Sequence, residues 1–406
     1  MPSTYLPIAF TALLGLCLAA GAPAQAEDPV WTAALPNARP ACLSAIHVYV
    51  RPGAGEAVEY LRAEAIEDGC VPATPPDGSA ADAGLTREAR PVDGNLHRGA
   101  WAWRSELWQQ DPEAFIASAL NQGLDQIFIS VPIVEGEVDP TPALQQLIAT
   151  AHASGVAVSA VEGDPEMVTP VGLQYAQIRA RALRQYNLDH PATPLDGLQY
   201  DIEPYLLPDY ALAPEAMLER WGQSVIALSE TYGANVDVVI PFWLPLVPGG
   251  QEALNTVRAR AGRLTVMAYR TAPGSILTAA QPALIWGEAH DLAVIIALEA
   301  GPLEDEYLQV YRPALNGSLQ ISQAGSVQEV HLLADAVPGT VDQPVYRYSH
   351  TVTAPASRVS FGGDLPALHR ALDEVEPMLN GYDSYAGVAI HGLFQIADPA
   401  LIRNEP

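Results

Sequence analysis

Gln199, Asp201 and Glu203 stand at alternate positions of the segment DGLQYDIEPY (196–205), which otherwise has the pattern of a buried strand. Alternate side chains of a β-strand point to one face, so these three polar groups lie side by side. Polar groups are costly in a protein interior unless they are hydrogen-bonded or take part in chemistry. Two carboxyl groups at one end of a strand can supply the acid and the assisting group that cleavage of a glycosidic bond needs. The alternative is an interior polar network that only joins neighbouring strands.

Glu203 is the expected general acid. Like-charge repulsion from an ionised Asp201 favours the protonated form of its neighbour, which is the form that a general acid needs. A second arrangement adds Glu299, which lies at the end of the apolar segment LAVIIALEA (292–300). Two carboxyl groups about 5 to 5.5 Å apart can act as acid and nucleophile with retention of configuration. Both arrangements make Glu203 the acid, and they differ in whether Glu299 takes part.

Eight apolar, β-rich segments are expected to position these groups. They alternate with amphipathic helical segments such as 111–123, which opens with Asp111 and Pro112 and closes on Gly123. This alternation predicts an α/β fold, a (β/α)8 TIM barrel over residues 97–400. An open doubly wound sheet is the competing fold, but it would normally show a glycine-rich turn after its first strand, where this chain has WAWRSELW. The expected strands are 97–103, 126–133, 156–163, 197–204, 235–243, 263–270, 292–300 and 385–393.

Two parts of the chain fall outside this alternation. Residues 27–96 form an N-terminal extension with a strand-like segment, SAIHVYV, a helical segment at 55–69 and a Pro/Gly/Ala/Asp-rich linker at 71–84. Residues 301–363 form an insertion after the seventh strand, and the segment 344–363 alternates like a β-hairpin. An insertion at this place lies on the active-site face of a barrel, so it is expected to shape the cleft.

Residues 1–26 are expected to be a signal peptide. LPIAFTALLGLCLAA is an apolar run of suitable length, and the following APAQA places cleavage after Ala26. The mature chain is therefore expected to be secreted or periplasmic. It keeps Cys42 and Cys70, an even pair in an oxidising compartment, for which a disulfide bond is expected. Two unrelated buried thiols are the alternative.

The composition argues against several partners. The formal net charge is −27, and 49% of the residues are hydrophobic, which is ample for a large core. A strongly acidic surface repels nucleic acid and anionic membranes, so neither is an expected partner. The sequence contains neither a G-x-S-x-G motif nor a His-x-x-x-His pair, and we expect no cofactor and no metal.

The fourth predicted strand resembles that of the family-18 glycoside hydrolases, the chitinase and endo-β-N-acetylglucosaminidase group, which carries D-G-x-D-x-D-x-E. Asp196, Gly197, Asp201 and Glu203 match this motif, while Gln199 stands where the family has an Asp. The resemblance implies that Glu203 is the general acid. It also implies that Asp201 orients the N-acetyl group of the substrate, which itself attacks the anomeric carbon.

Two further segments bear on the resemblance, which covers roughly residues 97–398. MAYR (267–270) is similar to the family's M-x-Y-D, which implies that the Tyr269 hydroxyl steadies the N-acetyl oxygen, while Arg270 stands in place of Asp. The family usually has a Trp at the end of the eighth strand, where this chain offers His391 and Phe394.

Other side chains near strand ends are candidates for sugar binding. Aromatic rings stack on the apolar face of a sugar, and polar groups around them bind its hydroxyls. For each Trp, packing in the barrel core is the alternative. The candidates are Gln199, Trp101, Trp103, Arg104, Tyr205, Trp243, Arg270 and His391.

The sequence thus predicts an exported glycoside hydrolase that acts on a polysaccharide or an N-acetylated glycan, with retention of configuration. The alternative function is a non-catalytic carbohydrate-binding protein on the same barrel, because Gln199, Arg270 and the absent Trp depart from the family pattern. The retained Asp201 and Glu203 favour catalysis, since a pure lectin needs no acid in the barrel mouth.

Overall fold

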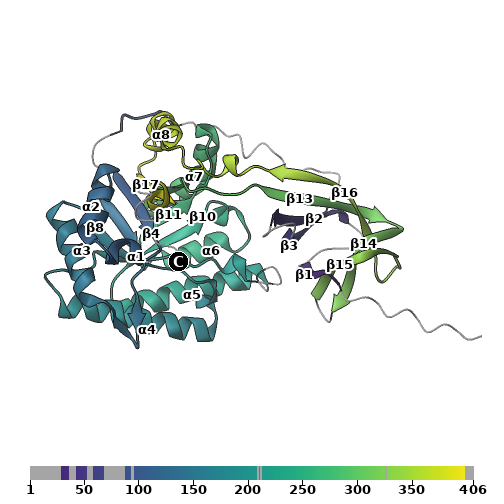
Figure 1. The fold of residues 1–406 in the computed structure, drawn as a ribbon, viewed down its shortest axis with the longest axis horizontal. Coiled ribbons are helices and arrows are strands. Elements are labelled where there is room, and N and C mark those ends of the chain that lie inside the picture. Colours follow the sequence, from purple (N-terminus) through teal and green to yellow (C-terminus); the bar gives the residue numbers. More distant parts are fainter. Residues whose placement is uncertain are drawn as a thin grey trace, which may run out of the picture.

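A closed barrel of eight parallel strands forms the larger part of the molecule (Figure 1). The computed structural model describes residues 29–35, 43–52, 58–67, 87–92, 96–207, 210, 213–324 and 327–397. All eight expected barrel strands are present, and closure of the sheet excludes the open doubly wound fold. In barrel order they are β10 (Val236–Pro241), β11 (Ala261–Met267), β12 (Ala293–Glu299), β17 (Tyr385–His391), β4 (His97–Ala102), β5 (Gln126–Ile129), β8 (Ala157–Glu162) and β9 (Gly197–Tyr200).

Helices cover the outside of the barrel and end where the sequence predicts. The Asp111 carboxylate accepts a hydrogen bond from the Ala114 amide and caps α2, while Gly233 closes α5 in the left-handed conformation with φ 87°. The helices are α1 (Glu106–Gln109), α2 (Pro112–Asn121), α3 (Thr141–Ala153), α4 (Pro170–Asp189), α5 (Pro214–Tyr232), α6 (Gly250–Val257), α7 (Pro273–His290), α8 (Leu365–Leu379) and α9 (Leu393–Ala397). A short hairpin of β6 (Ile133–Val134) and β7 (Glu137–Val138) precedes α3.

The two faces of β9 pack as the alternation predicts. Leu198, Tyr200 and Ile202 belong to the core between the barrel and its helices. Gln199 lies on the other face and is completely buried. A second apolar cluster fills the barrel interior and is made of Trp101, Phe128, Val161, Val239, Met267, Ile295, Ala297 and Ala389.

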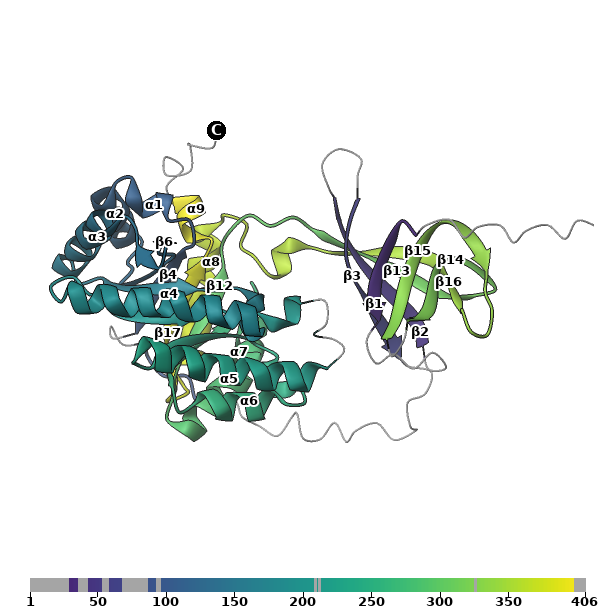
Figure 2. The ribbon, with the colours of Figure 1, turned by 90° about the horizontal axis from the view of Figure 1, so that it is seen from below.

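A seven-stranded antiparallel sheet lies beside the barrel (Figures 1 and 2). It combines strands from the N-terminal extension with strands from the insertion, and it has a small core of its own around Ile46, Leu319 and Val330. In sheet order the strands are β1 (Trp31–Leu35), β15 (Val327–Pro338), β14 (Asn316–Ala324), β16 (Val345–Ala354), β13 (Glu306–Ala314), β2 (Leu43–Pro52) and β3 (Val58–Glu67).

One expectation for these parts was wrong. The segment 55–69 was expected to be helical, but its residues Val58–Glu67 form β3, which pairs with β2 along its length. Pairing with another strand overrides local propensity here. The insertion does contain a β-hairpin, as expected, formed by the antiparallel strands β14 and β15. The alternating segment 344–363 supplies one strand, β16, which pairs with β13 and β14.

Three expectations concern residues outside the described parts of the chain. They are the signal peptide at 1–26, the linker at 71–84, and the disulfide between Cys42 and Cys70. Each therefore stays a prediction. Among the helices that the structure describes, none combines the length and the apolar composition needed to cross a membrane.

Candidate active site

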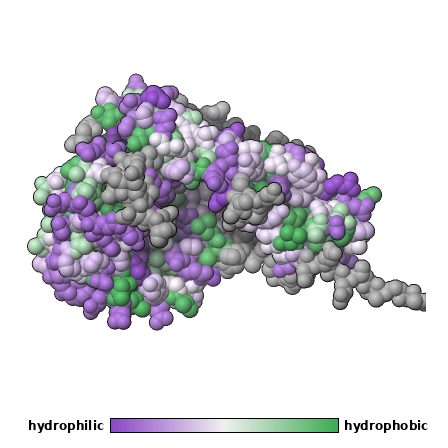
Figure 3. Space-filling view, in the orientation of Figure 1, coloured by the Kyte–Doolittle hydropathy of each residue, from purple (hydrophilic) through white to green (hydrophobic). Residues whose placement is uncertain are grey.

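A cleft of about 960 Å³ opens where the C-terminal ends of the barrel strands face the seven-stranded sheet. The surface is visibly hollowed between these two parts of the molecule (Figure 3). Active sites of (β/α)8 enzymes lie at this end of the barrel. The insertion does shape the cleft, because Leu303, Glu304, Glu306 and Arg358 line it.

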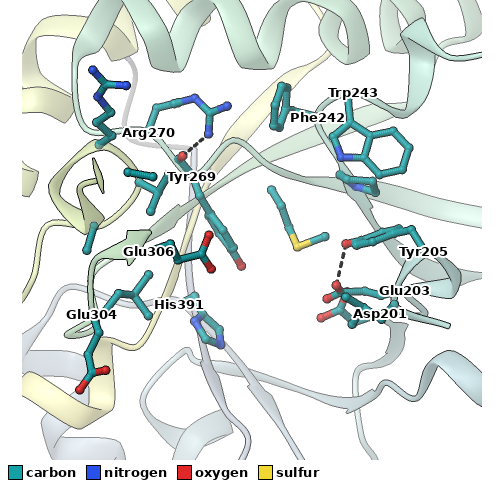
Figure 4. Close-up of a pocket in the computed structure, with 18 of the residues that line it drawn as sticks. Asp201, Glu203, Tyr205, Phe242, Trp243, Tyr269, Arg270, Glu304, Glu306 and His391 are labelled. Carbon is teal, nitrogen blue, oxygen red and sulfur yellow. Dashed lines mark hydrogen bonds between the residues drawn. The ribbon is translucent and has the colours of Figure 1, made fainter. Parts of the chain in front are cut away.

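Asp201 and Glu203 lie together on one wall of the cleft, directly after β9 (Figure 4). The end of the neighbouring strand β8 approaches very closely at Gly163. A Cβ atom on Gly163 would stand 2.6 Å from the backbone oxygen of Asp201, so only glycine fits there. The Oδ1 atom of Asp201 is buried and has no hydrogen-bond partner in the described chain. A buried, unpaired carboxyl oxygen is costly, which is typical of a group that acts on a ligand.

Burial and, next, the negative charge of Glu203 raise the pKa of Asp201 to about 7, while His391 works to lower it. The like-charge repulsion expected from the sequence therefore acts on the carboxyl group of Asp201. Near neutral pH the Asp201 carboxyl group therefore both gains and loses its proton.

An aromatic wall continues from Glu203. The Tyr205 hydroxyl donates a hydrogen bond of 2.6 Å to Oε2 of Glu203. The Tyr205 ring meets Trp243 edge to face, with ring centroids 5.1 Å apart. Burial and then the charge of Glu203, together with this hydrogen bond, raise the pKa of Tyr205, so it stays a donor at neutral pH. Tyr205 and Trp243 both line the cleft, where flat rings can pack on a sugar.

The opposite wall carries Tyr269, Arg270 and His391 (Figure 4). Burial, followed by the charges of Asp201, Glu299 and Glu203, raises the pKa of Tyr269, so its hydroxyl is also protonated. The Arg270 guanidinium donates to the Tyr269 carbonyl at 2.6 Å and lies over the Phe242 ring, 4.5 Å from its centroid. These contacts hold Arg270 in a defined position at the cleft.

Gln199 and Trp101 do not line the cleft, although both were expected to bind substrate. The Trp101 indole donates to Oε1 of Gln199 at 2.7 Å, and the amide nitrogen of Gln199 donates to the Thr265 hydroxyl at 3.2 Å. This corrects the expectation that both residues bind substrate: Gln199 belongs to an interior polar network, which was its alternative, and Trp101 packs in the barrel core, which was the alternative for each Trp. The network occupies the place where the family motif has a carboxylate.

Trp103 and Arg104 follow β4 and have different surroundings. Trp103 lines the main cleft, as expected. Arg104 does not, and lines a smaller hollow of about 40 Å³ together with His391 and Phe394. Phe394 itself is 1% exposed and packs on Phe115, with ring centroids 4.6 Å apart, so it does not replace the expected Trp floor.

Glu299 does not line the cleft either. Its side chain is only 5% exposed, and both of its oxygens are engaged. Oε1 accepts a hydrogen bond of 2.6 Å from the Gly301 amide, and Oε2 lies 2.5 Å from Nδ1 of His391. A nucleophile must reach the anomeric carbon, so this position does not favour the two-carboxylate mechanism.

The sequence reasoning missed the polar groups that reach the cleft from the second sheet. Arg51 of β2 and Glu306 of β13 lie on its rim, 3.5 Å apart, and Glu304 and Arg358 are nearby in the insertion. The position of the insertion after the seventh strand was the only available signal. Among the described residues, no group of three or more His, Cys, Asp or Glu side chains could hold a metal ion.

Comparison with known proteins gives only distant structural similarity. No family model and no curated protein matches the sequence. The spore cortex-lytic enzyme SleL of Bacillus cereus is similar with a TM-score of 0.41 and 9% identity, over 73% of this chain and 70% of that one. The GH18 chitinase ChiB of Flavobacterium johnsoniae is similar with a TM-score of 0.37 and 11% identity, over 75% of this chain and 89% of that one. The endo-β-N-acetylglucosaminidase of Cordyceps militaris has a TM-score of 0.34 and 15% identity, over 52% of this chain and 69% of that one. The resemblance to family-18 structures is thus a distant one.

Proposed function

We propose that this protein is an exported glycoside hydrolase that cleaves a polysaccharide or an N-acetylated glycan with retention of configuration. Glu203 is the general acid in this proposal, and Asp201 assists. The observation that carries the proposal is the pair of adjacent carboxyl groups on the wall of the cleft, of which Asp201 has a pKa of about 7 and a buried Oδ1 without a partner among the described residues. A carboxyl group that titrates near neutral pH, next to a second carboxyl group, suits a site that must both donate a proton and stabilise positive charge.

The proposed reaction gives each group of the cleft one role. Glu203 protonates the glycosidic oxygen as the bond to the leaving sugar breaks. The N-acetyl oxygen of the substrate then attacks the anomeric carbon, with Asp201 orienting the acetamido group and Tyr269 donating a hydrogen bond to its oxygen. Water then attacks the anomeric carbon from the face that the leaving sugar has left, its proton passes to Glu203, and the bond to the N-acetyl oxygen breaks. The two displacements together retain the configuration. Trp243 and Tyr205 supply the apolar surface on which a sugar ring packs.

The test is release of reducing ends from a panel of β-linked polysaccharides and N-acetylated oligosaccharides. The wild-type protein is compared with Glu203→Gln and with Glu374→Gln, which changes an exposed carboxylate of α8 on the outside of the barrel. We expect the Glu203 variant to lose about 10³-fold or more of the rate and the Glu374 variant to keep it. Full activity of the Glu203→Gln variant would contradict the proposal.

A non-catalytic carbohydrate-binding protein is the second candidate. One observation favours it: the Tyr205 hydroxyl already donates a hydrogen bond to Oε2 of Glu203, so one oxygen of the proposed acid is engaged within the protein. Binding of an oligosaccharide by both the wild-type protein and the Glu203→Gln variant, with no reducing ends released by either, would establish this candidate.

A further inference from the structure

Glu299 has a built environment that the proposed chemistry does not use. It lies at the end of β12, next to His391 in the parallel register with β17. Gly301 and Gly392 pack directly against its carboxylate, since a Cβ atom on either would stand 2.8 Å or 2.6 Å from Oε1. Gly392 also has a positive φ of 70°. Two glycines thus leave room for one carboxylate, and that carboxylate holds one imidazole.

His391 connects this buried carboxylate to the cleft. Its side chain is 33% exposed and lines the cleft, and its Nδ1 is bound to Glu299. Nε2 has no hydrogen-bond partner among the described residues. The ring lies between Trp101 of β4 and Tyr269, which follows β11, with ring centroids 6.2 Å and 6.1 Å away. Contacts with Glu299, Trp101 and Tyr269 therefore hold the orientation of the imidazole.

Three carboxyl groups and one guanidinium surround His391. Glu299 comes from β12, Asp201 and Glu203 follow β9, and the neutral hydroxyl of Tyr269 follows β11. The guanidinium is that of Arg104 after β4, which lines the small hollow beside His391. Burial works to lower the pKa of His391, but the hydrogen bond and charge of Glu299, followed by the charges of Asp201 and Glu203, raise it overall above its ordinary value. In turn, the charge of His391 works to lower the pKa of Asp201. The two sites thus act on each other.

We propose that Glu299 holds His391 as an imidazolium in the cleft that Asp201 and Glu203 also line, and that His391 is a positioning residue whose positive charge stabilises the ionised form of Asp201. This inference rests on the proposed function, because it assigns a role within the same site. It replaces a nucleophilic Glu299 with a Glu299 that acts only through His391.

The first test is direct titration of the Asp201 carboxyl group by carbon-detected NMR on protein labelled at aspartate, with the resonance assigned by Asp201→Asn. Loss of the imidazolium charge in His391→Gln removes an attraction that favours ionised Asp201. We therefore expect its pKa to rise by about one unit. Glu299→Gln should shift it in the same direction, because a His391 without its carboxylate is largely neutral at pH 7.

His152→Gln is the matched control, since His152 also pairs with a carboxylate, Nε2 to Oδ2 of Asp196 at 2.9 Å, away from the cleft. It should leave the titration of Asp201 unchanged. A second readout follows the His391 Nδ1 proton, which should give a strongly deshielded resonance at pH 7 that disappears in Glu299→Gln. Unchanged titration of Asp201 in His391→Gln, or an equal shift in His152→Gln, overturns the proposal.

Enzyme kinetics separate this inference from the proposed function. If the wild-type protein hydrolyses a glycan, the alkaline limb of the pH–rate profile should lie at higher pH in both His391→Gln and Glu299→Gln. A Glu299→Gln variant that is inactive at every pH while His391→Gln turns over would make Glu299 the nucleophile and refute the inference. If no glycan is hydrolysed but the titration of Asp201 shifts as expected, the inference stands and the proposed function fails.

Discussion

The end of β9 and the end of β12 both carry carboxyl groups at the mouth of the barrel, but the two ends differ in how fully these groups are hydrogen-bonded. Asp201 has a buried oxygen that no described residue hydrogen-bonds, and its pKa is raised to about 7. Glu299 has both oxygens bound, one by the Gly301 amide and one by His391. A carboxylate whose hydrogen bonds are complete stabilises the fold, whereas an incomplete one is kept at a cost in stability.

This difference separates two residues that are equivalent in sequence terms. Asp201 directly follows β9 and Glu299 is the last residue of β12, so each lies at the C-terminal end of a barrel strand. Only the surroundings distinguish a group available for chemistry from a group that holds another side chain. Four changes test the distinction, beginning with the largest expected effect.

Glu299→Ala should lower the free energy of unfolding by about 4 kcal/mol. The change removes the buried partner of both the Gly301 amide and the His391 imidazole and leaves a cavity. Urea denaturation measures the loss. Glu374→Ala on the exposed surface of α8 is the control and should cost less than about 0.5 kcal/mol. A loss for Glu299→Ala no larger than that of the control would remove the contrast with Asp201.

Glu162→Gln should destabilise the protein by about 3 kcal/mol, because Glu162 at the end of β8 is a second carboxylate with complete hydrogen bonds. The Arg179 guanidinium binds it in a bidentate manner, at 2.5 Å and 2.7 Å, and the Glu162 side chain is 5% exposed. The amide leaves the buried Arg179 charge without its counterion. Thermal or urea unfolding at pH 7 gives the value, and an unchanged stability would show that burial and bonding do not predict which carboxylates support the fold.

Asp201→Asn should have the opposite sign and stabilise the protein by about 3 kcal/mol at pH 6. The folded-state pKa of Asp201 lies above the unfolded value, so its stabilising contribution is complete below about pH 4 and is lost as the pH rises to about 7. Across this pH range the free energy of unfolding of the wild-type protein therefore falls relative to that of the variant. Unfolding measured at pH 4, 6 and 8 should show a difference that grows with pH. A constant difference would contradict the raised pKa.

Trp243→Ala should have the smallest effect, a weakening of oligosaccharide binding by about 1 kcal/mol, or about fivefold. The ring lines the cleft and packs edge to face on Tyr205. The Michaelis constant should rise while the turnover number changes little. A large fall in the turnover number would instead place Trp243 in the positioning of Tyr205 and Glu203.

The sequence was sufficient for the barrel and for the two faces of its fourth strand. Strong alternation fixed all eight strands, and Leu198 and Gln199 point to opposite sides as predicted. The second sheet could not be predicted, because β3 pairs with β2 and β2 with β13, and β13 is more than 230 residues away in the chain. Local patterns carry no information about a partner so distant.

The site shows the same limit. The spacing of Asp201 and Glu203 was enough to find them, and Trp243 and Tyr205 followed from their places after strands. The bonded state of Glu299 could not be read, since it depends on the neighbouring strand and on the backbone of Gly301. Burial and hydrogen bonding, rather than residue type, decide the role of a carboxylate.

The most direct test of the account compares the release of reducing ends from one substrate by the wild-type protein, Glu203→Gln and Glu299→Gln, in the first turnover and in the steady state. The account predicts that Glu203→Gln abolishes release in both phases. Glu299→Gln should remain active, with the alkaline limb of its pH–rate profile moved to higher pH. Equal and complete loss in both variants, with the fold intact, would contradict it and would make Glu299 a partner of Glu203 in the chemistry.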